Sequence, residues 1–111
     1  MLLLHFFVNN DRFNDPRHIE WAKKVKQRDK FTCRVCGAQK VYLHSHHLNA
    51  FAYFVEDRFN IANGITLCSK CHDRYHQIYG SGRNTYIQFK EFLDIINTIK
   101  EISKEKKDES T

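Results

Sequence analysis

Four cysteines stand in two matching pairs. Cys33 and Cys36 form one Cys-x-x-Cys pair, and Cys68 and Cys71 form the second after 31 intervening residues, 37–67. Each pair can chelate one side of a tetrahedral ion, and four thiolates at about 2.3 Å from Zn²⁺ make a closed site that adds folding free energy but no catalysis. Disulfides or a redox-active pair are the alternatives. Since no secretory signal is recognisable, we expect a reducing compartment and a structural zinc site.

Histidines form the second group of residues with chemical potential. His46 and His47 are adjacent, and His72 and His76 are four residues apart. Because residues i and i+4 share one face of an α-helix, His72 and His76 can point at one metal ion, with His46 approaching from a strand. Cys71 directly precedes His72, so the zinc site would hold the start of that helix. We assign no role to the remaining histidines, His5, His18 and His44, since a lone histidine is usually solvated or hydrogen-bonded.

The segments around these residues resemble a known enzyme family. HSHHL at 44–48 and NGITLCSKCHDRYH at 63–76 are similar to HNH nucleases of the subclass with a four-cysteine zinc site and a His-His first motif. The resemblance covers residues 33–76. It implies an α+β fold, with a ββα-metal core at about residues 33–78 that carries the structural zinc and is flanked by an N-terminal and a C-terminal helix. The implied activity is metal-dependent hydrolysis of phosphodiester bonds in DNA.

The resemblance also implies a role for individual residues. His46 and His72 would be metal ligands, and His47 the general base that takes a proton from the attacking water. Asn63 would hold His47 in orientation, although an Asn-Gly pair is also simply a good turn. His76 matches a third ligand in colicin-like members, and the alternative is a contact to phosphate. The divalent ion is left open among Mg, Mn, Ni, Co and Zn, with imidazole ligands disfavouring Mg.

This assignment makes a geometric demand on the strand that carries the paired histidines. Neighbouring side chains on a regular strand point to opposite faces. His46 and His47 can therefore reach one phosphate only if the strand ends or bulges there.

The charge of the chain favours a polyanionic partner, which we expect to be DNA. The formal net charge is +5 and the pI about 9.1, and lysine and arginine bind phosphates through charge neutralisation and counterion release. Arg58, Lys70 and Arg74 flank the motif and are the candidates for phosphate contact, although each is equally explained as surface charge. Lys23, Lys24 and Lys26 form a basic face, for which the same two explanations hold.

The elements that must position these residues follow from local patterns. Asp15-Pro16 predicts a helix start, with Ile19, Ala22 and Val25 on its apolar stripe. Further along the chain we expect a zinc knuckle at 31–37 with a turn at Gly37, a strand at 41–47, a helical turn and long loop at 48–62, a turn at 63–64, a short strand at 65–67 and a helix at 69–77.

A final helix is predicted after the Gly80-Ser81-Gly82 break. Thr85 and Gln88 form a capping-box signature, and a core-facing apolar stripe follows at Phe89, Phe92, Leu93, Ile96 and Ile99. Residues 1–103 would form a single domain, and the charged residues 104–111 a disordered tail. The apolar residues 1–8 are too short for a membrane span and are expected to be a strand or an apolar arm.

Two other functions remain open on the sequence alone. The first is a non-catalytic, zinc-stabilised DNA-binding domain, and the second is a metal-dependent hydrolase for another substrate. For the nuclease we expect a phage or bacterial enzyme of the nicking or homing-like kind, in the cytoplasm of a bacterial or phage-infected cell. A monomer would nick one strand, and a homodimer could cut both.

Overall fold

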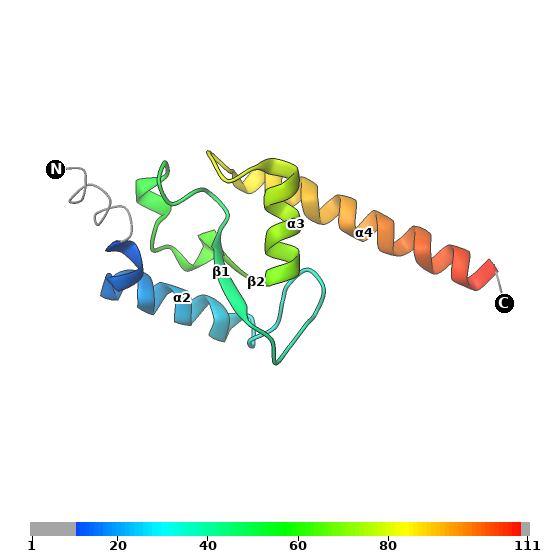
Figure 1. Ribbon diagram of the computed structural model, residues 1–111, viewed down its shortest axis with the longest axis horizontal. Helices are drawn as coiled ribbons and strands as arrows, with labels where there is room; N and C mark the ends of the chain where they lie inside the picture. Colours follow the sequence, from blue (N-terminus) through cyan, green and yellow to red (C-terminus); the bar gives the residue numbers. More distant parts are fainter. Residues whose placement is uncertain (1–10, 110–111) are drawn as a thin grey trace.

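The computed structural model describes residues 11–109, so the predicted apolar arm at 1–8 lies outside the described residues. Two strands, three α-helices and three short 3-10 turns follow one another along this range (Figure 1). In chain order they are η1 (Asp11–Asn14), α2 (Pro16–Arg28), β1 (Leu43–His47), η2 (Val55–Asp57), η3 (Ile61–Asn63), β2 (Gly64–Cys68), α3 (Ser69–Tyr79) and α4 (Tyr86–Glu109). None of the helices in this range has the length and apolar composition needed to cross a membrane.

The centre of the fold is a two-stranded antiparallel sheet followed directly by a helix. β1 and β2 pair in register, with His47 opposite Gly64 and His46 opposite Ile65. The long connection between the strands contains η2 and η3, as the mixed pattern of residues 48–62 predicts. β2 ends at Cys68 and α3 begins at Ser69, so the strand leads into the helix without a loop. The predicted α+β fold with a ββα core is confirmed.

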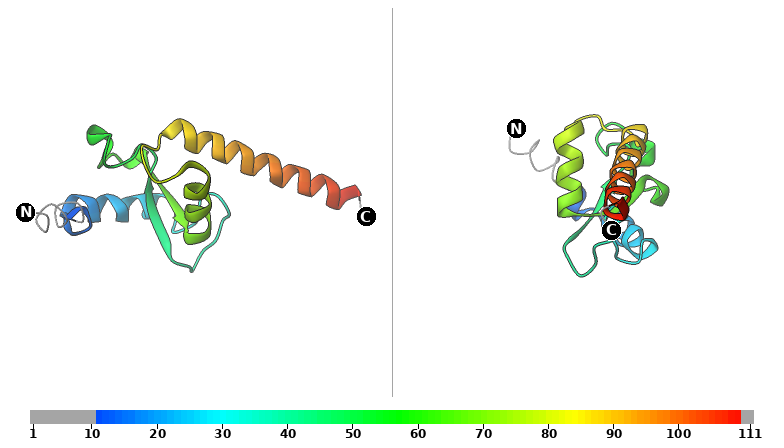
Figure 2. Two further views of the ribbon diagram at one scale, coloured as in Figure 1. Left: turned by 45° about the horizontal axis from the view of Figure 1, so that its top comes forward. Right: turned by 90° about the vertical axis from the view of Figure 1, so that its right-hand side faces the viewer.

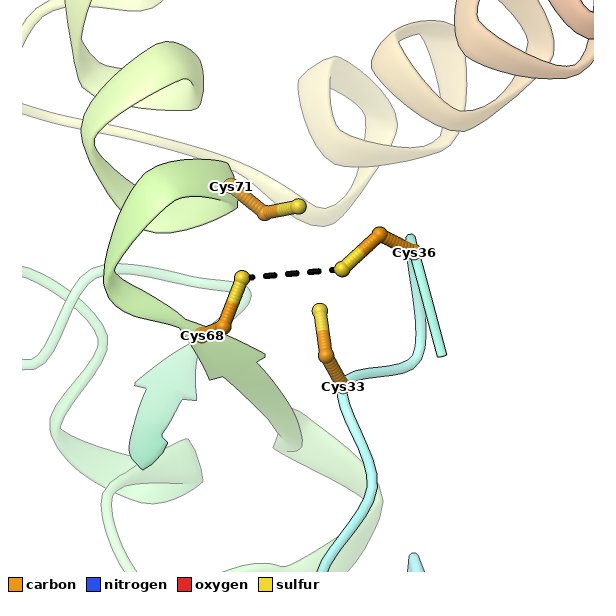
Figure 3. A group of neighbouring side chains, drawn as sticks. All are labelled: Cys33, Cys36, Cys68 and Cys71. Carbon is orange, nitrogen blue, oxygen red and sulfur yellow. Dashed lines mark hydrogen bonds between the residues drawn. The ribbon is translucent and has the colours of Figure 1, made fainter. Parts of the chain in front are cut away.

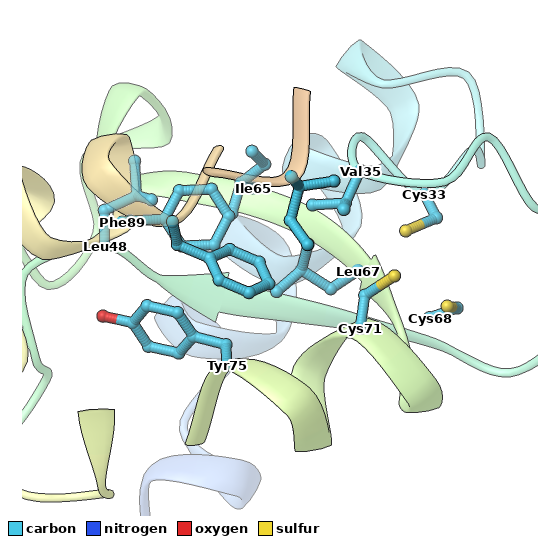
Figure 4. Close-up of a cluster of buried hydrophobic side chains, with 11 residues drawn as sticks. Cys33, Val35, Leu48, Ile65, Leu67, Cys68, Cys71, Tyr75 and Phe89 are labelled. Atoms are coloured by element: carbon cyan, nitrogen blue, oxygen red, sulfur yellow. The ribbon is translucent and has the colours of Figure 1, made fainter. Parts of the chain in front are cut away.

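The two faces of the sheet are covered by different helices. Ser45 donates a hydrogen bond to Ala22 O of α2 at 2.7 Å, and Thr66 donates one to Val25 O at 3.5 Å. The alternate residues of β2, Ile65 and Leu67, belong instead to the core formed with α3 and α4 (Figure 4). That core also contains Cys33, Val35, Leu48, Cys68, Cys71, Tyr75, Phe89, Phe92 and Ile96. The period-2 alternation of a strand therefore places consecutive side chains of the sheet in two separate environments.

Helix α2 begins where the sequence predicts but buries a different face. The Asp15 carboxylate caps it by accepting a hydrogen bond from Arg17 N at 2.9 Å. Its buried side chains are His18, Trp21 and Val25, whereas Ile19 is 53% exposed. The predicted stripe is therefore right at Val25 but wrong at Ile19 and Ala22, because the buried side chains, His18 and Trp21, each lie one residue earlier. The spacing of three and four is kept, and the larger indole ring takes the buried position.

Helix α4 begins with the predicted capping box and is longer than its packed part. Gln88 N donates to Thr85 Oγ1 at 3.3 Å, and Thr85 N donates to Gln88 Oε1 at 3.2 Å. Phe89, Phe92 and Ile96 are buried in the core, but Ile99 is 53% exposed, contrary to its predicted core position. The C-terminal half of α4 extends away from the other elements (Figures 1 and 2).

The predicted disordered tail at 104–111 is described only as far as residue 109. Residues 104–109 form the last turns of α4 in the structure. Lysine and glutamate are strong helix formers, and they continue a helix that is already nucleated.

Candidate metal centre and active site

The four cysteines meet at one point between the knuckle after α2 and the junction of β2 with α3 (Figure 3). Their Sγ atoms all lie within 4.8 Å of one another, and those of Cys36 and Cys68 are 3.6 Å apart. Two thiolates bound to one tetrahedral Zn²⁺ are separated by about 3.8 Å. The knuckle closes through a hydrogen bond from Gly37 N to Cys33 O at 2.9 Å, with Gly37 at φ +80° as predicted. The four thiols are thus positioned to hold one metal ion.

A second cluster is formed by three histidines. His46 comes from β1, and His72 and His76 come from successive turns of α3, with one ring nitrogen of each lying within 4.8 Å of the others. The Nε2 atoms of His72 and His76 are 3.1 Å apart. Two imidazole nitrogens on one tetrahedral ion are separated by about 3.3 Å, for metal–nitrogen distances of about 2.0–2.1 Å. The spacing of the cluster fits a shared divalent ion.

His46 lies deepest in this cluster. Its side chain is buried, and its Nε2 atom has no hydrogen-bond partner among the described residues. Burial lowers the pKa of His46 to about 3 and that of His72 to about 4. Both imidazoles are therefore neutral near pH 7 and have a lone pair to offer a metal.

Neighbouring groups orient the two imidazoles of α3. His76 donates from Nδ1 to Gly80 O at 2.8 Å, which leaves the lone pair on the Nε2 atom that faces His72. His44, to which the sequence assigns no role, stacks on His72 with ring centroids 4.5 Å apart and an interplanar angle of 25°. Its Nε2 atom lies 3.0 Å from Ser69 Oγ. The cluster is thus braced by interactions outside its ligand set.

His47 occupies the opposite face of the sheet and is held by α2 and the long loop. Its ring stacks on Trp21 with centroids 3.8 Å apart and an angle of 11°. Trp21 is itself fixed by a hydrogen bond from Nε1 to Asn60 O at 2.8 Å. His47 Nε2 donates to Arg58 O at 3.0 Å. Burial lowers the pKa of His47 to about 4, so the ring is neutral near pH 7.

The hydrogen bonds of the Asn63 side chain go to groups other than His47. Asn63 Oδ1 accepts a hydrogen bond from Asn49 N at 2.8 Å, and Asn63 Nδ2 donates to Asn49 O at 3.1 Å and Asp57 O at 3.2 Å. These bonds fasten both ends of the loop that carries Arg58. Asn63 is thus placed to act on His47 through the backbone of this loop, whose Arg58 carbonyl accepts the hydrogen bond of the ring.

Both sets of histidines line one cleft of about 660 Å³. His47 is the last residue of β1, so the strand ends at the point where the sequence requires it to end or bulge. His46 and His47 leave the strand on opposite faces and still border the same space. Basic side chains of the cleft wall are Arg12, Lys23 and Lys26.

The three predicted phosphate contacts, Arg58, Lys70 and Arg74, differ in their position relative to the cleft. Arg58 donates from Nε to Phe51 O at 2.8 Å, and its guanidinium carbon lies 4.4 Å from the centroid of the Phe51 ring. Lys70 and Arg74 are exposed on α3 and do not border the cleft. Arg58 therefore meets His47 through its backbone carbonyl, while Lys70 and Arg74 lie outside the cleft lining.

Sequence reasoning missed two contributors to the site. Trp21 lies outside the predicted stripe of Ile19, Ala22 and Val25, although its spacing from His18 and Val25 is the helical three and four that could have identified it. Asp29 is 5% exposed and accepts hydrogen bonds from Arg28, Arg34 and Thr66 N, which joins the end of α2 to β2 and the knuckle. No local pattern marks an aspartate for this role.

Comparison with known proteins agrees with the site. A family model described as HNH endonuclease matches residues 33–77. Among curated proteins, Anaredoxin from Nostoc sp. (strain PCC 7120 / SAG 25.82 / UTEX 2576) is 33% identical over 60 residues, which cover 54% of this chain and 76% of that protein. No solved structure matches the chain at a significant level. The matched family range spans all four cysteines and the residues of both histidine groups that line the cleft.

Proposed function

Because the chain belongs to the HNH endonuclease family, we propose that it is a metal-dependent endonuclease that hydrolyses phosphodiester bonds in DNA. One observation carries this proposal. A half-buried neutral imidazole, His47, borders the same cleft as a three-histidine cluster whose nitrogens are spaced for one ion. Phosphodiester hydrolysis requires these two parts, a proton acceptor for the attacking water and a cationic partner for the phosphate.

His47 would be the general base. The carbonyl of Arg58 only accepts hydrogen bonds, so the proton of the neutral ring resides on Nε2 and the lone pair on Nδ1. We propose that Nδ1 takes the proton from the attacking water. Stacking on Trp21 limits rotation of the ring, which keeps the lone pair in one direction and favours a productive geometry.

His46, His72 and His76 would hold one divalent ion, whose identity we leave open among Mg, Mn, Ni, Co and Zn. When bound, this ion supplies positive charge that offsets the charge growing on the phosphate and on the departing oxygen. The fit rests on the unpartnered Nε2 of His46 and the facing Nε2 atoms of His72 and His76. Cys33, Cys36, Cys68 and Cys71 would hold a structural Zn²⁺.

Lys23 and Lys26 of α2 are our candidates for contacts to the DNA backbone. Both border the cleft, and neither forms a salt bridge within the described residues. Lys24 is in contrast paired with Glu20 at 3.7 Å. One active site cuts one strand, so we propose that a monomer nicks DNA and that a double-strand break requires a homodimer.

The test is nicking of supercoiled plasmid by the wild type and by His47→Ala, each with Mg, Mn, Ni or Zn added. We expect His47→Ala to slow nicking by at least about 100-fold, because a general base contributes about 10²–10⁴-fold. Its zinc content and circular dichroism should match the wild type. Gln77→Ala, on the exposed side of α3, serves as the matched control and should nick normally.

The opposite result would favour a non-catalytic domain. If His47→Ala and the wild type nick plasmid equally, or neither nicks with any of the four metals, the proposed nuclease activity is wrong. A zinc-stabilised DNA-binding domain predicts that equality, together with unchanged DNA binding by His47→Ala.

A further inference from the structure

Three exposed aromatic side chains border the cleft, Phe13, Phe31 and Tyr42, and the last two are considered together. Phe31 is 54% exposed and Tyr42 is 75% exposed, and both line the same space as the histidine cluster. We call this pair the aromatic edge. Large apolar rings gain free energy from burial, so rings left open beside a charged cleft are available to pack against a ligand.

The backbone holds Phe31 in the open. Lys30 and Phe31 have φ angles of 54° and 51°, in the left-handed region that residues with a side chain rarely adopt. Phe31 N donates to Lys26 O at 2.9 Å, and Thr32 Oγ1 donates to Lys30 O at 3.0 Å. Such a conformation persists only where the surroundings hold it. The turn after α2 therefore fixes the backbone position from which this ring extends.

Tyr42 connects the rim to the histidine cluster through successive rings. Its ring meets the edge of His44 at a centroid distance of 4.8 Å and an angle of 77°. His44 in turn stacks on His72 at 4.5 Å. A base that stacked on Tyr42 would therefore belong to a nucleotide within a few positions of a phosphate at the cluster, since successive bases are about 3.4 Å apart along one strand.

The charge beside these rings fits a nucleic-acid strand. Lys23 and Lys26 border the cleft on the α2 side and have no salt bridge within residues 11–109. Rings for bases and cations for phosphates, side by side in one groove, are the combination that binds single strands. A duplex hides the faces of its bases between neighbouring pairs, so exposed rings can stack only on bases that are unpaired.

We propose that the aromatic edge stacks unpaired bases next to the scissile phosphate, so that the protein prefers DNA with a single-stranded segment at the cut site. This inference rests on the proposed nuclease function, for which it specifies the form of the substrate. Phe31 and Tyr42 would be specificity-determining residues, and neither would take part in the chemical step.

The test measures binding without cleavage. Fluorescence anisotropy of a fluorescein-labelled oligonucleotide, single-stranded or annealed to its complement, is recorded in the His47→Ala background. We expect Tyr42→Ala to weaken single-strand binding by about 10-fold, in the range measured for loss of one base–aromatic stack. Phe31→Ala should have a similar effect, and Tyr42→Phe, which keeps the ring, should bind nearly normally. Duplex binding should change less than two-fold.

Tyr86→Ala is the matched control, because this tyrosine is 51% exposed on α4 and does not border the cleft. Normal single-strand binding by Tyr42→Ala would overturn the inference, as would equal losses for single strand and duplex. Zinc content is measured for each variant. If Tyr42→Ala lacks zinc, Tyr42→Leu is used in its place. A protein that nicks plasmid but shows no dependence on these rings contradicts the aromatic edge alone, whereas absence of nicking contradicts the proposed function.

Discussion

His47 and Arg58 are joined by a hydrogen bond of 3.0 Å from the imidazole Nε2 to the carbonyl oxygen. The bond selects one tautomer of the neutral ring, because a carbonyl cannot donate. Arg58 directly follows η2, and Asn63 binds the backbone of Asp57, the residue before it. The orientation of the proposed base thus depends on the shape of a loop, and the loop depends on one buried asparagine.

We expect Asn63→Ala to affect both folding and activity. The substitution removes three hydrogen bonds from a buried side chain, which predicts a loss of about 2–3 kcal/mol in the free energy of unfolding. It also frees the loop that carries Arg58, so kcat for nicking should fall more than KM changes. Urea unfolding and plasmid nicking with varied DNA concentration measure the two effects.

Asn60→Ala provides the control for a role in the turn alone. The Asn60 side chain accepts one local hydrogen bond, from Ala62 N at 3.0 Å, and is exposed. This variant should lose less stability and keep its kcat. If Asn63→Ala is destabilised yet nicks at the wild-type rate, Asn63 stabilises the turn and does not orient His47.

Gly64→Ala should disturb the packing of Trp21 under His47. A Cβ at this position would lie 2.7 Å from Trp21 Cζ2 and would also overlap Val25 Cγ2. Both neighbours are buried, so we expect a loss of about 1–3 kcal/mol in unfolding free energy from overpacking. Trp21 is the sole tryptophan of the chain, so its fluorescence spectrum reports the change directly.

Gly82→Ala is the matched glycine control, because a Cβ there meets nothing within 4 Å. It should leave stability and fluorescence unchanged. Wild-type stability in Gly64→Ala would show that α2 can move off the sheet without cost, and that close packing on Gly64 is not what holds Trp21.

Cys36→Ser tests the structural zinc site with little change in packing, because Cys36 is the exposed member of the four. A serine hydroxyl is a poor replacement for a thiolate ligand. We expect bound zinc, measured by elemental analysis after dialysis, to fall from one equivalent to well below half, with a clear drop in Tm. His72→Ala should instead retain this zinc. Full zinc content in Cys36→Ser would contradict four-cysteine coordination.

The carboxyl of Asp29 should make the free energy of unfolding depend on pH in the acid range. Burial raises the pKa of its carboxyl, but hydrogen bonds from Arg28, Arg34 and Thr66 outweigh this effect and lower the pKa to about 2. The unfolded value is about 3.9. Because the folded pKa is the lower one, the stabilisation is complete above about pH 4 and is lost as the pH falls towards 2.

Asp29→Asn should therefore lose about 3 kcal/mol at pH 7, the cost of breaking a buried ion pair. The difference in unfolding free energy between wild type and variant, measured by urea unfolding, should stay constant from pH 7 to pH 5 and shrink below pH 4. Comparing the two proteins at each pH cancels the acid release of zinc that both share. A difference that grows on acidification would contradict the low pKa of Asp29.

The sequence by itself determined the features that arise between near neighbours. The Cys-x-x-Cys spacing brings paired thiols to one ion, and positions 72 and 76 share a helix face. The Asp15 cap and the capping box of Thr85 and Gln88 were also predicted and are confirmed. Chelation within a turn and helix capping involve residues at most four apart, so the local pattern is sufficient to predict them.

Only the tertiary structure decided what surrounds these residues. The stack of Trp21 on His47, the carbonyl that Arg58 presents to it, and the position of His44 against His72 join segments that are distant along the chain. Such contacts depend on which face of α2 meets the sheet and on the path of a 16-residue loop, residues 48–63. Helical periodicity allowed a stripe through Ile19 as well as one through Trp21, and the packing of the indole ring on Gly64 selected between them.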